Sequence, residues 1–332
     1  MNNGYVEATN QSSRRPELSP AGGKPGASSV RATWSILARP SRPLASRPVE
    51  KFGPALVATL FFAALAAAGC GAADQGSAPA GGATDSAQPD PVATIADLFA
   101  GNVEIVDMTH ALSPDAVYWP GSERSPFEYE ARATHPSGAV SMGAYSTPEH
   151  HGTHLDAPIH GGDNLPTVDQ LTAADLFGPV AVIDVTVAAA ADPDYAVTRD
   201  DLLVWEERNG RLPAGAIVLM RSGWSEKYGD ADAYRNQDDD GRMHFPGFSE
   251  EAARFLIDER DIRGIGVDTL SVDPGAGRGF PAHGVVNGNG KFHLENVANL
   301  HLLPEAGAYL IVAPIKIAGG SGGQVRIFGV VP

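Results

Sequence analysis

Short apolar runs recur through the last two thirds of the chain, and their lengths are typical of strands. Six of them lie between segments rich in Gly, Pro, Asp and Asn. Apolar runs of this length, bounded by turn-forming residues, are characteristic of strands rather than of long helices. The pattern predicts strands at 105–108, 180–185, 216–220, 262–267, 309–317 and 325–331.

Two helices are predicted between these strands. The sequence Thr198-Arg199-Asp200-Asp201 resembles a capping box, which marks the start of a helix. This helix is predicted to present Leu202 and Trp205 on one face. Ser249 can cap a second helix, whose first turn is acidic, as the helix dipole favours. Its buried face is predicted to hold Ala252, Phe255 and Leu256. Strands and helices together indicate a mixed α/β fold.

The N-terminal part has the pattern of an export signal. Lys51 precedes an uncharged apolar run, 52–73, which narrows to small residues before Cys70, the only cysteine. Ala-Ala-Gly-Cys resembles a bacterial lipobox, so Cys70 is the predicted lipidation site. An uncleaved anchor helix is the alternative, because the run is long enough to span a bilayer. Both interpretations predict an exported, membrane-anchored protein at the cell surface or in the periplasm.

Composition divides the chain into three segments. We predict an N-terminal extension with a lipoprotein-type signal peptide over 1–69, and a lipidated cysteine with a flexible tether over 70–92. The tether is rich in Gly, Ala, Ser and Pro and buries too little apolar surface to offset its ordering entropy. The remainder, 93–332, has the size of a single large domain. Because the chain has a single cysteine, it cannot form an internal disulfide, so this domain must be stabilised by packing, and metal can contribute.

Charge excludes one class of partner. Residues 1–69 carry 8 Lys/Arg and 3 Asp/Glu, whereas residues 70–332 carry 16 and 37. A domain this acidic repels phosphate backbones, so no nucleic-acid partner is expected. Contact with a membrane is expected only through the lipid anchor.

The densest group of candidate ligands lies between positions 149 and 160. His150, His154, Asp156 and His160 are separated by even numbers and would share one face of a strand. In a straight strand His150 and Asp156 would be about 20 Å apart, too far for one ion. The chain must therefore bend, and Gly152 supplies the backbone freedom.

The residue types indicate which ion would bind. Pro158 prevents an ordinary helix from running through the segment, so a helical zinc motif is not expected. Imidazole and carboxylate ligands together suit zinc, manganese or iron(II), whereas calcium and magnesium prefer oxygen alone. We expect a divalent metal cofactor, zinc or manganese, as one or two ions.

The segment from His150 to His160 reads His-x-Gly-Thr-His-x-Asp-x-Pro-x-His. It resembles the signature of the cyclase family of metal-dependent hydrolases, which includes bacterial kynurenine formamidases and isatin hydrolases. The resemblance implies that His150, His154 and Asp156 bind metal. It also implies that His160, beside the ion, transfers protons as the catalytic acid/base.

A second part of the resemblance lies near the C-terminus. The formamidase type has a later His and Glu twelve residues apart, and His283 and Glu295 reproduce this spacing. They would complete the ligands of one ion, or form the site of a second ion with Asp156 bridging the two. Alternatively, either residue would orient a metal ligand by a hydrogen bond without touching the ion itself. The resemblance implies a swivelling β/β/α fold for the domain. Surface or hydrogen-bonded roles are expected for His110, His135, His244, His293 and His301.

Further segments resemble family landmarks. Trp119 and Trp224 lie in two of them and are candidate substrate contacts, although packing roles are equally compatible with their type. Gly161 departs from the formamidase pattern, which has an aromatic residue there, so the substrate pocket is expected to differ. The landmarks are 118–121, 221–224, 245–247, 266–271 and 319–323.

These features together predict an amide hydrolase. Its substrate would be a small formyl amide or cyclic amide (lactam), attacked by metal-activated water. A polyketide-type cyclase or dehydrating lyase is the alternative enzyme, because the family name covers such chemistry too. A non-catalytic metal-binding surface lipoprotein is the alternative outside enzymes. A homodimer or higher homo-oligomer is expected.

Overall fold

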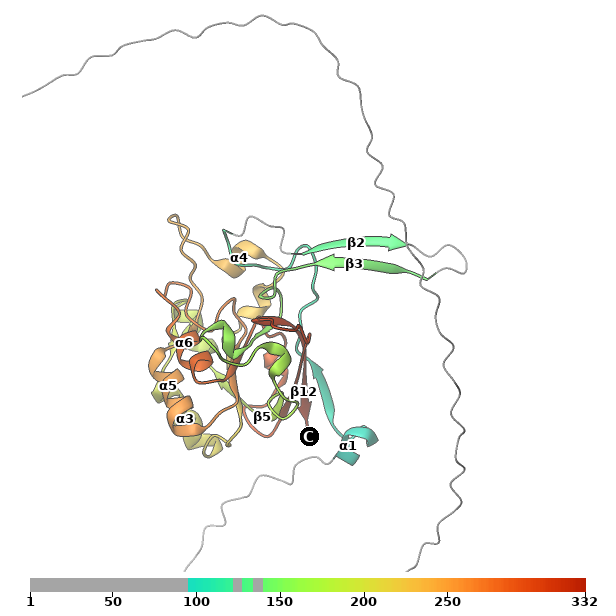
Figure 1. Cartoon of the computed structure of the whole chain (residues 1–332). Coiled ribbons are helices and arrows are strands. Elements are labelled where there is room, and N and C mark those ends of the chain that lie inside the picture. The colour runs from blue at the N-terminus through green and yellow to red at the C-terminus, as the bar shows by residue number, and fades with distance from the viewer. Residues whose placement is uncertain (1–94, 122–126, 134–139) are drawn as a thin grey trace, which may run out of the picture. The chain divides into compact units, whose positions relative to one another are not determined.

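The computed structural model of the protein describes residues 95–121, 127–133 and 140–332. A closed β-barrel forms the centre of this described part. Seven strands follow one another around the ring in the order β12-β11-β5-β7-β9-β10-β4, and β4 pairs back to β12. β1 (Glu104–Asp107) adds to the outside of β12 (Figure 1). The other ring strands are β4 (His154–Asp156), β5 (Phe177–Asp184), β7 (Ile217–Arg221), β9 (Gly264–Val267), β10 (Phe292–Glu295), β11 (Tyr309–Pro314) and β12 (Gly322–Val331).

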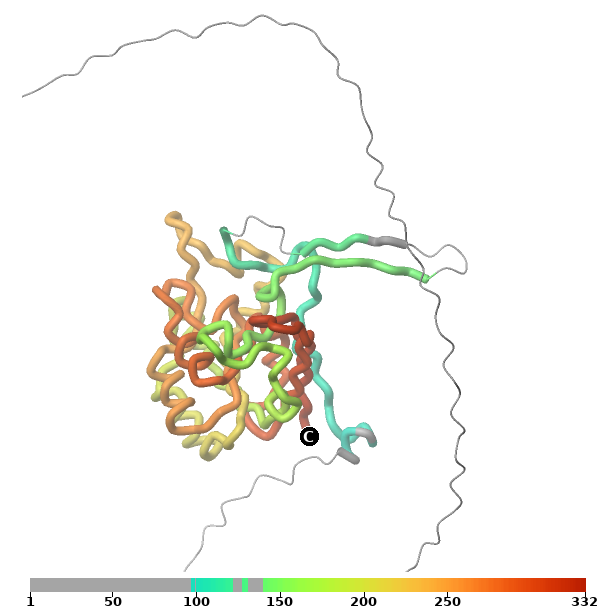
Figure 2. The backbone as a smooth tube through the Cα atoms, in the orientation of Figure 1, coloured from blue at the N-terminus to red at the C-terminus, as the bar shows by residue number. Residues whose placement is uncertain are grey.

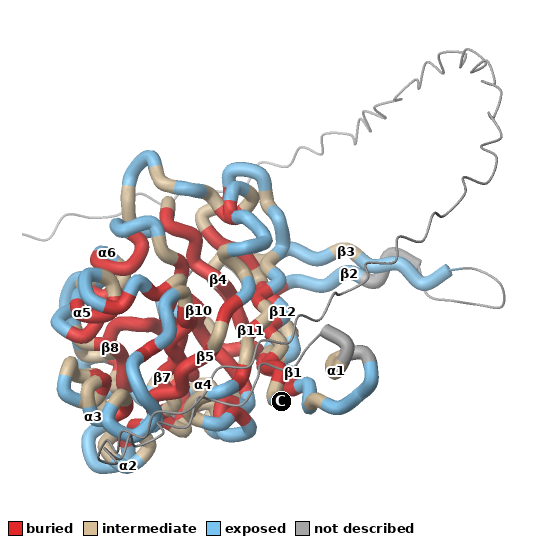
Figure 3. Tube along the Cα trace, turned by 90° about the horizontal axis from the view of Figure 1, so that it is seen from below, coloured by how far each residue is buried: buried red, intermediate tan, exposed pale blue. Residues whose placement is uncertain are grey.

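Alternation along the strands divides the core into two layers. In β7, Ile217 and Leu219 belong to one apolar cluster, whereas Val218 and Met220 belong to another. The first cluster also contains residues of β4, β10, β11 and β12 and so fills the barrel. The second contains the apolar faces of three outer helices, which include residues 202, 255 and 285. The central strands are therefore apolar on both faces, which is why the sequence shows them as continuous runs (Figure 3).

The two predicted helices pack on the outside of the barrel. In α3 (Arg199–Asn209), Thr198 and Asp201 form the capping box, and Leu202 and Trp205 are buried. In α5 (Glu250–Arg260), the Ser249 side chain accepts a hydrogen bond from the Ala252 amide. Both predictions are confirmed. The other helices are α1 (Ile95–Ala100), α2 (Thr186–Ala191), α4 (Ala231–Arg235) and α6 (Pro281–Gly288), with 3-10 turns at Pro158–His160, Val168–Gln170, Trp224–Lys227 and Leu300–Leu302.

Two-stranded sheets complete the fold. β2 (Glu128–Ala133) and β3 (Met142–Ser146) form an antiparallel hairpin that extends away from the barrel (Figure 2). β6 (Ala196–Val197) and β8 (Gly247–Phe248) form a short parallel pair. All six strands predicted from apolar runs are present, within a few residues of the expected bounds. β4, β10 and the hairpin were not predicted, because they are short or carry polar residues.

The predicted signal peptide, the tether and Cys70 lie outside the described residues. Within the described ranges, no helix is long and apolar enough to cross a membrane.

A buried aspartate joins two of the sequence landmarks. Asp268, fully buried after β9, accepts hydrogen bonds from the Ser222 amide and hydroxyl and from the amides of Gly223 and Trp224. Burial raises the pKa of Asp268, although these donors act against it. Landmarks 221–224 and 266–271 thus fix each other and hold the loops at one end of the barrel.

Replacing this acceptor should destabilise the protein. Asp268→Asn keeps the shape but turns an NH2 group towards buried N–H donors, so we expect the free energy of unfolding to fall by about 3 kcal/mol. Urea denaturation measures the change. Asp258→Asn, at an exposed position of α5, is the control. Equal stabilities of the two variants would show that the Asp268 contacts contribute nothing.

Candidate metal centre and active site

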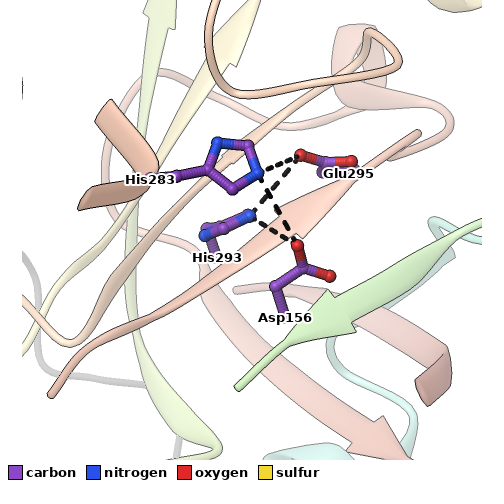
Figure 4. A group of neighbouring side chains, drawn as sticks. All are labelled: Asp156, His283, His293 and Glu295. Carbon is purple, nitrogen blue, oxygen red and sulfur yellow. Dashed lines mark ion pairs between the residues drawn. The ribbon is translucent and has the colours of Figure 1, made fainter. Parts of the chain in front are cut away.

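Two neighbouring strands supply the centre of the site. In the antiparallel pair β4–β10, Asp156 lies opposite His293 and His154 lies opposite Glu295. Opposite residues of an antiparallel pair point to the same face, so these four side chains converge. All four are at most 5% exposed. The register of this one strand pair therefore builds a buried His/Asp/Glu cluster. Figure 4 shows Asp156, His293 and Glu295 of this cluster, together with His283.

The remaining side chains arrive from irregular segments. Gly152 has φ +66°, the bend that the spacing required, and it brings His150 Nδ1 to 2.6 Å from Asp156 Oδ1. The 3-10 turn Pro158–His160 places His160 Nε2 3.5 Å from Asp156 Oδ2. The rings of His150 and His160 lie with their centroids 4.0 Å apart and their planes tilted by 34°.

α6 contributes His283 to the cluster. Its Nε2 lies 3.5 Å from Glu295 Oε1 and 3.8 Å from Asp156 Oδ2. Its Nδ1 is hydrogen-bonded to Asp273 at 2.6 Å, and Asp273 also accepts from the backbone amides of Ala282 and His283. Asp273 thus fixes both the start of α6 and the orientation of the imidazole.

The two carboxylates divide the site into two ligand groups. Asp156 Oδ1 faces His150 and His154, whereas Asp156 Oδ2 faces His283 and His293. Glu295 is split in the same way, with Oε2 towards His154 and Oε1 towards His283 and His293. Potential ligand atoms lie within 4.8 Å of one another in each of two sets: His150, His154, Asp156; and Asp156, His283, His293, Glu295.

Unpaired nitrogen atoms show that the residues fit a metal ion. His154 Nδ1 donates to the carbonyl of Gly152 at 2.9 Å, which leaves Nε2 with its lone pair towards the carboxylates. Buried Nε2 atoms of His154 and His293 have no hydrogen-bond partner among the described residues. A divalent cation bound by imidazole and carboxylate would satisfy these atoms.

Electrostatics favours positive charge at the same place. Burial alone would lower the pKa of His154 and of His293, but the carboxylates of Asp156 and Glu295 raise the values to about 9 and about 10. Burial also acts to raise the pKa of Asp156, but His293 and His154 hold it well below its usual range. The site thus has the negative potential that attracts a divalent cation.

His160 differs from the other histidines of the cluster. Burial lowers its pKa to about 4, although Asp156 acts in the opposite direction. Its side chain is 34% exposed, whereas that of His154 is 3% exposed. An imidazole that is neutral at pH 7 and reaches the cavity can accept a proton from a bound molecule.

A cavity of about 310 Å³ opens above the ligands. It is lined by Tyr118, Trp119 and Phe280, and also by His154, Asp156 and Glu295. Trp119, one of the two predicted substrate contacts, is 42% exposed and packs edge-on against Phe245.

Trp224, the other predicted substrate contact, lies outside this lining. It is 4% exposed, and its Nε1 donates to the carbonyl of Tyr234 at 2.7 Å. Lys227 lies over its ring. These contacts are those of a packing residue, the other role compatible with its type.

The glycine-rich landmark 319–323 orients one candidate ligand. Ser321 Oγ donates to Glu149 Oε2 and lies 2.8 Å from His150 Nε2. The Ser321 hydroxyl oxygen can therefore accept a hydrogen bond from the Nε2–H of His150, which leaves the unprotonated Nδ1 of His150 facing Asp156. Gly322 packs so closely on His150 that a Cβ would lie 2.7 Å from Cε1.

Removing the hydroxyl should weaken metal binding. For Ser321→Ala we expect a loss of about 10–100-fold in metal affinity, as for other outer partners of ligating histidines. Competition with a chromogenic chelator measures it. Ser141→Ala, at an exposed position, serves as control. Unchanged affinity in Ser321→Ala would mean that Ser321 does not orient the ligand.

Two buried histidines were given no functional role in the sequence analysis. His293 was expected to be an ordinary residue, but it lies inside the cluster and is fully buried. The signal that could have found it is its spacing: His293 and Glu295 are two apart, as are His154 and Asp156. His151 is 2% exposed, lines the cavity and has no hydrogen-bond partner among the described residues.

Comparison with known proteins agrees with this geometry. The profile of the Cyclase family matches residues 106–274. Isatin hydrolase of Roseibium aggregatum is 35% identical over 257 residues, which cover 71% of this chain and 95% of that protein. Kynurenine formamidase of Bacillus cytotoxicus is 30% identical over 225 residues, which cover 67% and 95%.

A solved structure shows the same fold. Isatin hydrolase A from Labrenzia aggregata, bound to benzyl benzoate, is 39% identical, with a TM-score of 0.67 over 71% of this chain and 97% of that one. The mixed α/β barrel is therefore that of the isatin hydrolase structures. With its signature, its buried His/Asp/Glu cluster and these relatives, the chain belongs to the cyclase family and is an amide hydrolase of the isatin hydrolase and kynurenine formamidase type.

Proposed function

We propose that the protein hydrolyses the carbonyl C–N bond of a small aromatic amide, either a cyclic amide such as isatin or a formyl amide such as N-formylkynurenine. The observation that carries this proposal is the convergence of the candidate metal ligands and His160 at one cavity. The names of the relatives support these two substrates.

The residues of the cluster have distinct proposed tasks. His150, His154 and Asp156 would hold the ion that faces the cavity, and His283 and Glu295 would contribute to the same ion or to a second one bridged by Asp156. When bound, a divalent ion supplies Lewis acidity, which polarises a carbonyl group and makes water a nucleophile near neutral pH. Imidazole and carboxylate ligands support zinc or manganese.

His160 would transfer the proton. Its Nε2 is the partly exposed nitrogen beside Asp156, and the cavity reaches it. We propose that it takes a proton from the attacking water and delivers it to the leaving nitrogen. The side chains of Tyr118, Trp119 and Phe280 would pack against an aromatic ring and exclude water.

A product assay separates this function from the alternative enzyme. The full chain is incubated with isatin and with N-formylkynurenine, and the products are identified by mass spectrometry. Hydrolysis adds one water to isatin and releases formate from N-formylkynurenine. A cyclised or dehydrated product would instead favour a lyase.

A homodimer or higher homo-oligomer is proposed from the β2–β3 hairpin. Tyr129, Met142 and Tyr145 are more than half exposed on it. Isolated two-stranded hairpins are marginally stable, so a partner surface would stabilise this one. Analytical ultracentrifugation tests the proposal: a monomer at micromolar concentration would contradict it.

Two further proposals concern location and fold class. Cys70 after a lipobox-like sequence supports an exported lipoprotein, and Cys70→Ser should then shift the protein from the membrane fraction to the soluble fraction. Unchanged fractionation would contradict lipid anchoring.

The swivelling β/β/α class is supported by the parallel strands β5, β7 and β9 with helices packed outside. A crystal structure without this arrangement would contradict it.

A further inference from the structure

A small side pocket lies beside the main cavity and shares two of its aromatic side chains. The side pocket has a volume of about 90 Å³, whereas the main cavity has about 310 Å³. Trp119 and Phe280 line both spaces, and their ring centroids are 6.0 Å apart. An aromatic ring that packs against these two side chains in the main cavity can therefore extend a substituent into the side pocket.

Two charged residues, Asp273 and Arg278, line the side pocket. Asp273 is 4% exposed, accepts hydrogen bonds from the amides of Ala282 and His283, and is hydrogen-bonded to His283 Nδ1. Its negative charge is therefore already offset by three donors. Arg278 is exposed, and its guanidinium group has no hydrogen-bond or ion-pair partner among the described residues. The charge that the side pocket offers to a ligand is thus positive.

A free guanidinium group is unusual in a domain this acidic. Residues 70–332 contain 37 Asp/Glu and 16 Lys/Arg. Arg208, Arg221 and Arg260 each pair with a carboxylate of the chain. The guanidinium group of arginine presents its N–H donors in a planar fork that matches the two oxygens of a carboxylate. The ligand chemistry that fits Arg278 is therefore a carboxylate that the chain itself does not supply.

The backbone that carries Arg278 is held in place by its own contacts. The Gly275 amide donates a hydrogen bond to the Phe245 carbonyl at 2.9 Å, and a Cβ at Gly275 would lie 2.9 Å from the Phe245 ring. Gly279, directly after Arg278, has φ +82°, which favours glycine. The turn is thus ordered before a ligand binds, and only the Arg278 side chain remains to be fixed.

We propose that Arg278 binds a carboxylate of the substrate, and so selects aromatic amides that carry an anionic substituent. This inference rests on the proposed function, because it names the substrate class of that same active site. The aromatic ring would pack against Trp119 and Phe280, and the carboxylate would reach the side pocket. N-formylkynurenine carries such a carboxylate, whereas isatin carries none, so acid-bearing formyl amides are the preferred class.

A matched pair of compounds tests the proposal on the full chain. N-formylkynurenine and its methyl ester differ in one methyl group and in the negative charge of the carboxylate. For Arg278→Gln we expect KM to rise about tenfold for the acid, with a much smaller change for the ester, because charge-assisted hydrogen bonds to the carboxylate are lost. The value of kcat should be nearly unchanged, since this contact is remote from the reacting bond.

Two further variants sharpen this comparison. Arg278→Lys keeps the charge but not the planar fork, so it should recover part of the lost affinity for the acid. Arg242→Gln is the control, because Arg242 is also exposed but lines neither cavity. Its KM values should equal those of the wild type. Added salt should raise KM for the acid more in the wild type than in Arg278→Gln.

Calorimetric binding of the products, kynurenine and its methyl ester, separates this proposal from the proposed function. Kynurenine should bind Arg278→Gln about tenfold more weakly than it binds the wild type, and the ester should not distinguish the two proteins. The proposal is overturned if kynurenine does not bind the wild type, if it binds both proteins equally, or if acid and ester weaken equally. Selective loss of kynurenine binding in a protein that hydrolyses neither formyl compound would support the anion site and count against the formamidase activity.

Discussion

Asp156→Asn is expected to abolish metal binding and with it catalysis. Asp156 is the one residue common to both ligand groups, with Oδ1 in one and Oδ2 in the other. The amide keeps the side-chain volume but loses the negative charge that offsets the positive potential of the ion. We expect kcat/KM to fall by at least about 1,000-fold, equivalent to about 4 kcal/mol of transition-state stabilisation.

Elemental analysis and turnover should be measured on the same Asp156→Asn preparation. Asp258→Asn, which changes an exposed aspartate on α5, controls for the loss of one negative charge. Circular dichroism shows whether the variant is folded, because metal bound only to the native state also contributes to stability. A folded Asp156→Asn protein with wild-type metal content would remove Asp156 from the ligand set.

His160→Gln is expected to lose turnover while it keeps its metal. His160 is partly exposed, and its Nε2 is 3.5 Å from the nearest carboxylate oxygen, so no ligand group depends on it. Loss of a general acid/base costs about 100- to 10,000-fold in rate. The loss should be in kcat, with a smaller effect on KM, because the aromatic side chains that line the cavity are unchanged.

The matched control is His301→Gln, an exposed histidine outside the cavity. Metal content is measured beside kcat for both variants. Loss of metal from His160→Gln would make His160 a ligand. Wild-type kcat in His160→Gln would mean that another group transfers the proton.

The sequence predicted the parts of the site that depend on local spacing. Glycine at 152 was expected to bend the chain, and its positive φ does so. Thr198 and Ser249 were expected to begin helices, and they do, because capping depends only on the next three residues. The strands β5 and β7 were found because they are apolar on both faces and therefore read as continuous apolar runs.

Other parts depend on contacts between distant segments. β4 and β10 are short and rich in polar residues, and no local pattern reveals that Asp156 lies opposite His293. His293 was therefore taken for an ordinary residue. Trp224 could not be separated from Trp119 by residue type, since burial by α4 and Tyr234 distinguishes them only in three dimensions. Ser321 reaches His150 across a separation of 171 residues.

The central claim is that the buried His/Asp/Glu cluster makes this protein a metal-dependent amide hydrolase. The most direct test measures hydrolysis of isatin and of N-formylkynurenine by the full chain before chelation, after chelation, and after zinc or manganese is restored. We expect turnover of at least one compound, its loss on chelation and its recovery with metal. Turnover that persists in metal-free protein, or folded and fully metallated protein that is inert on both compounds, would contradict it.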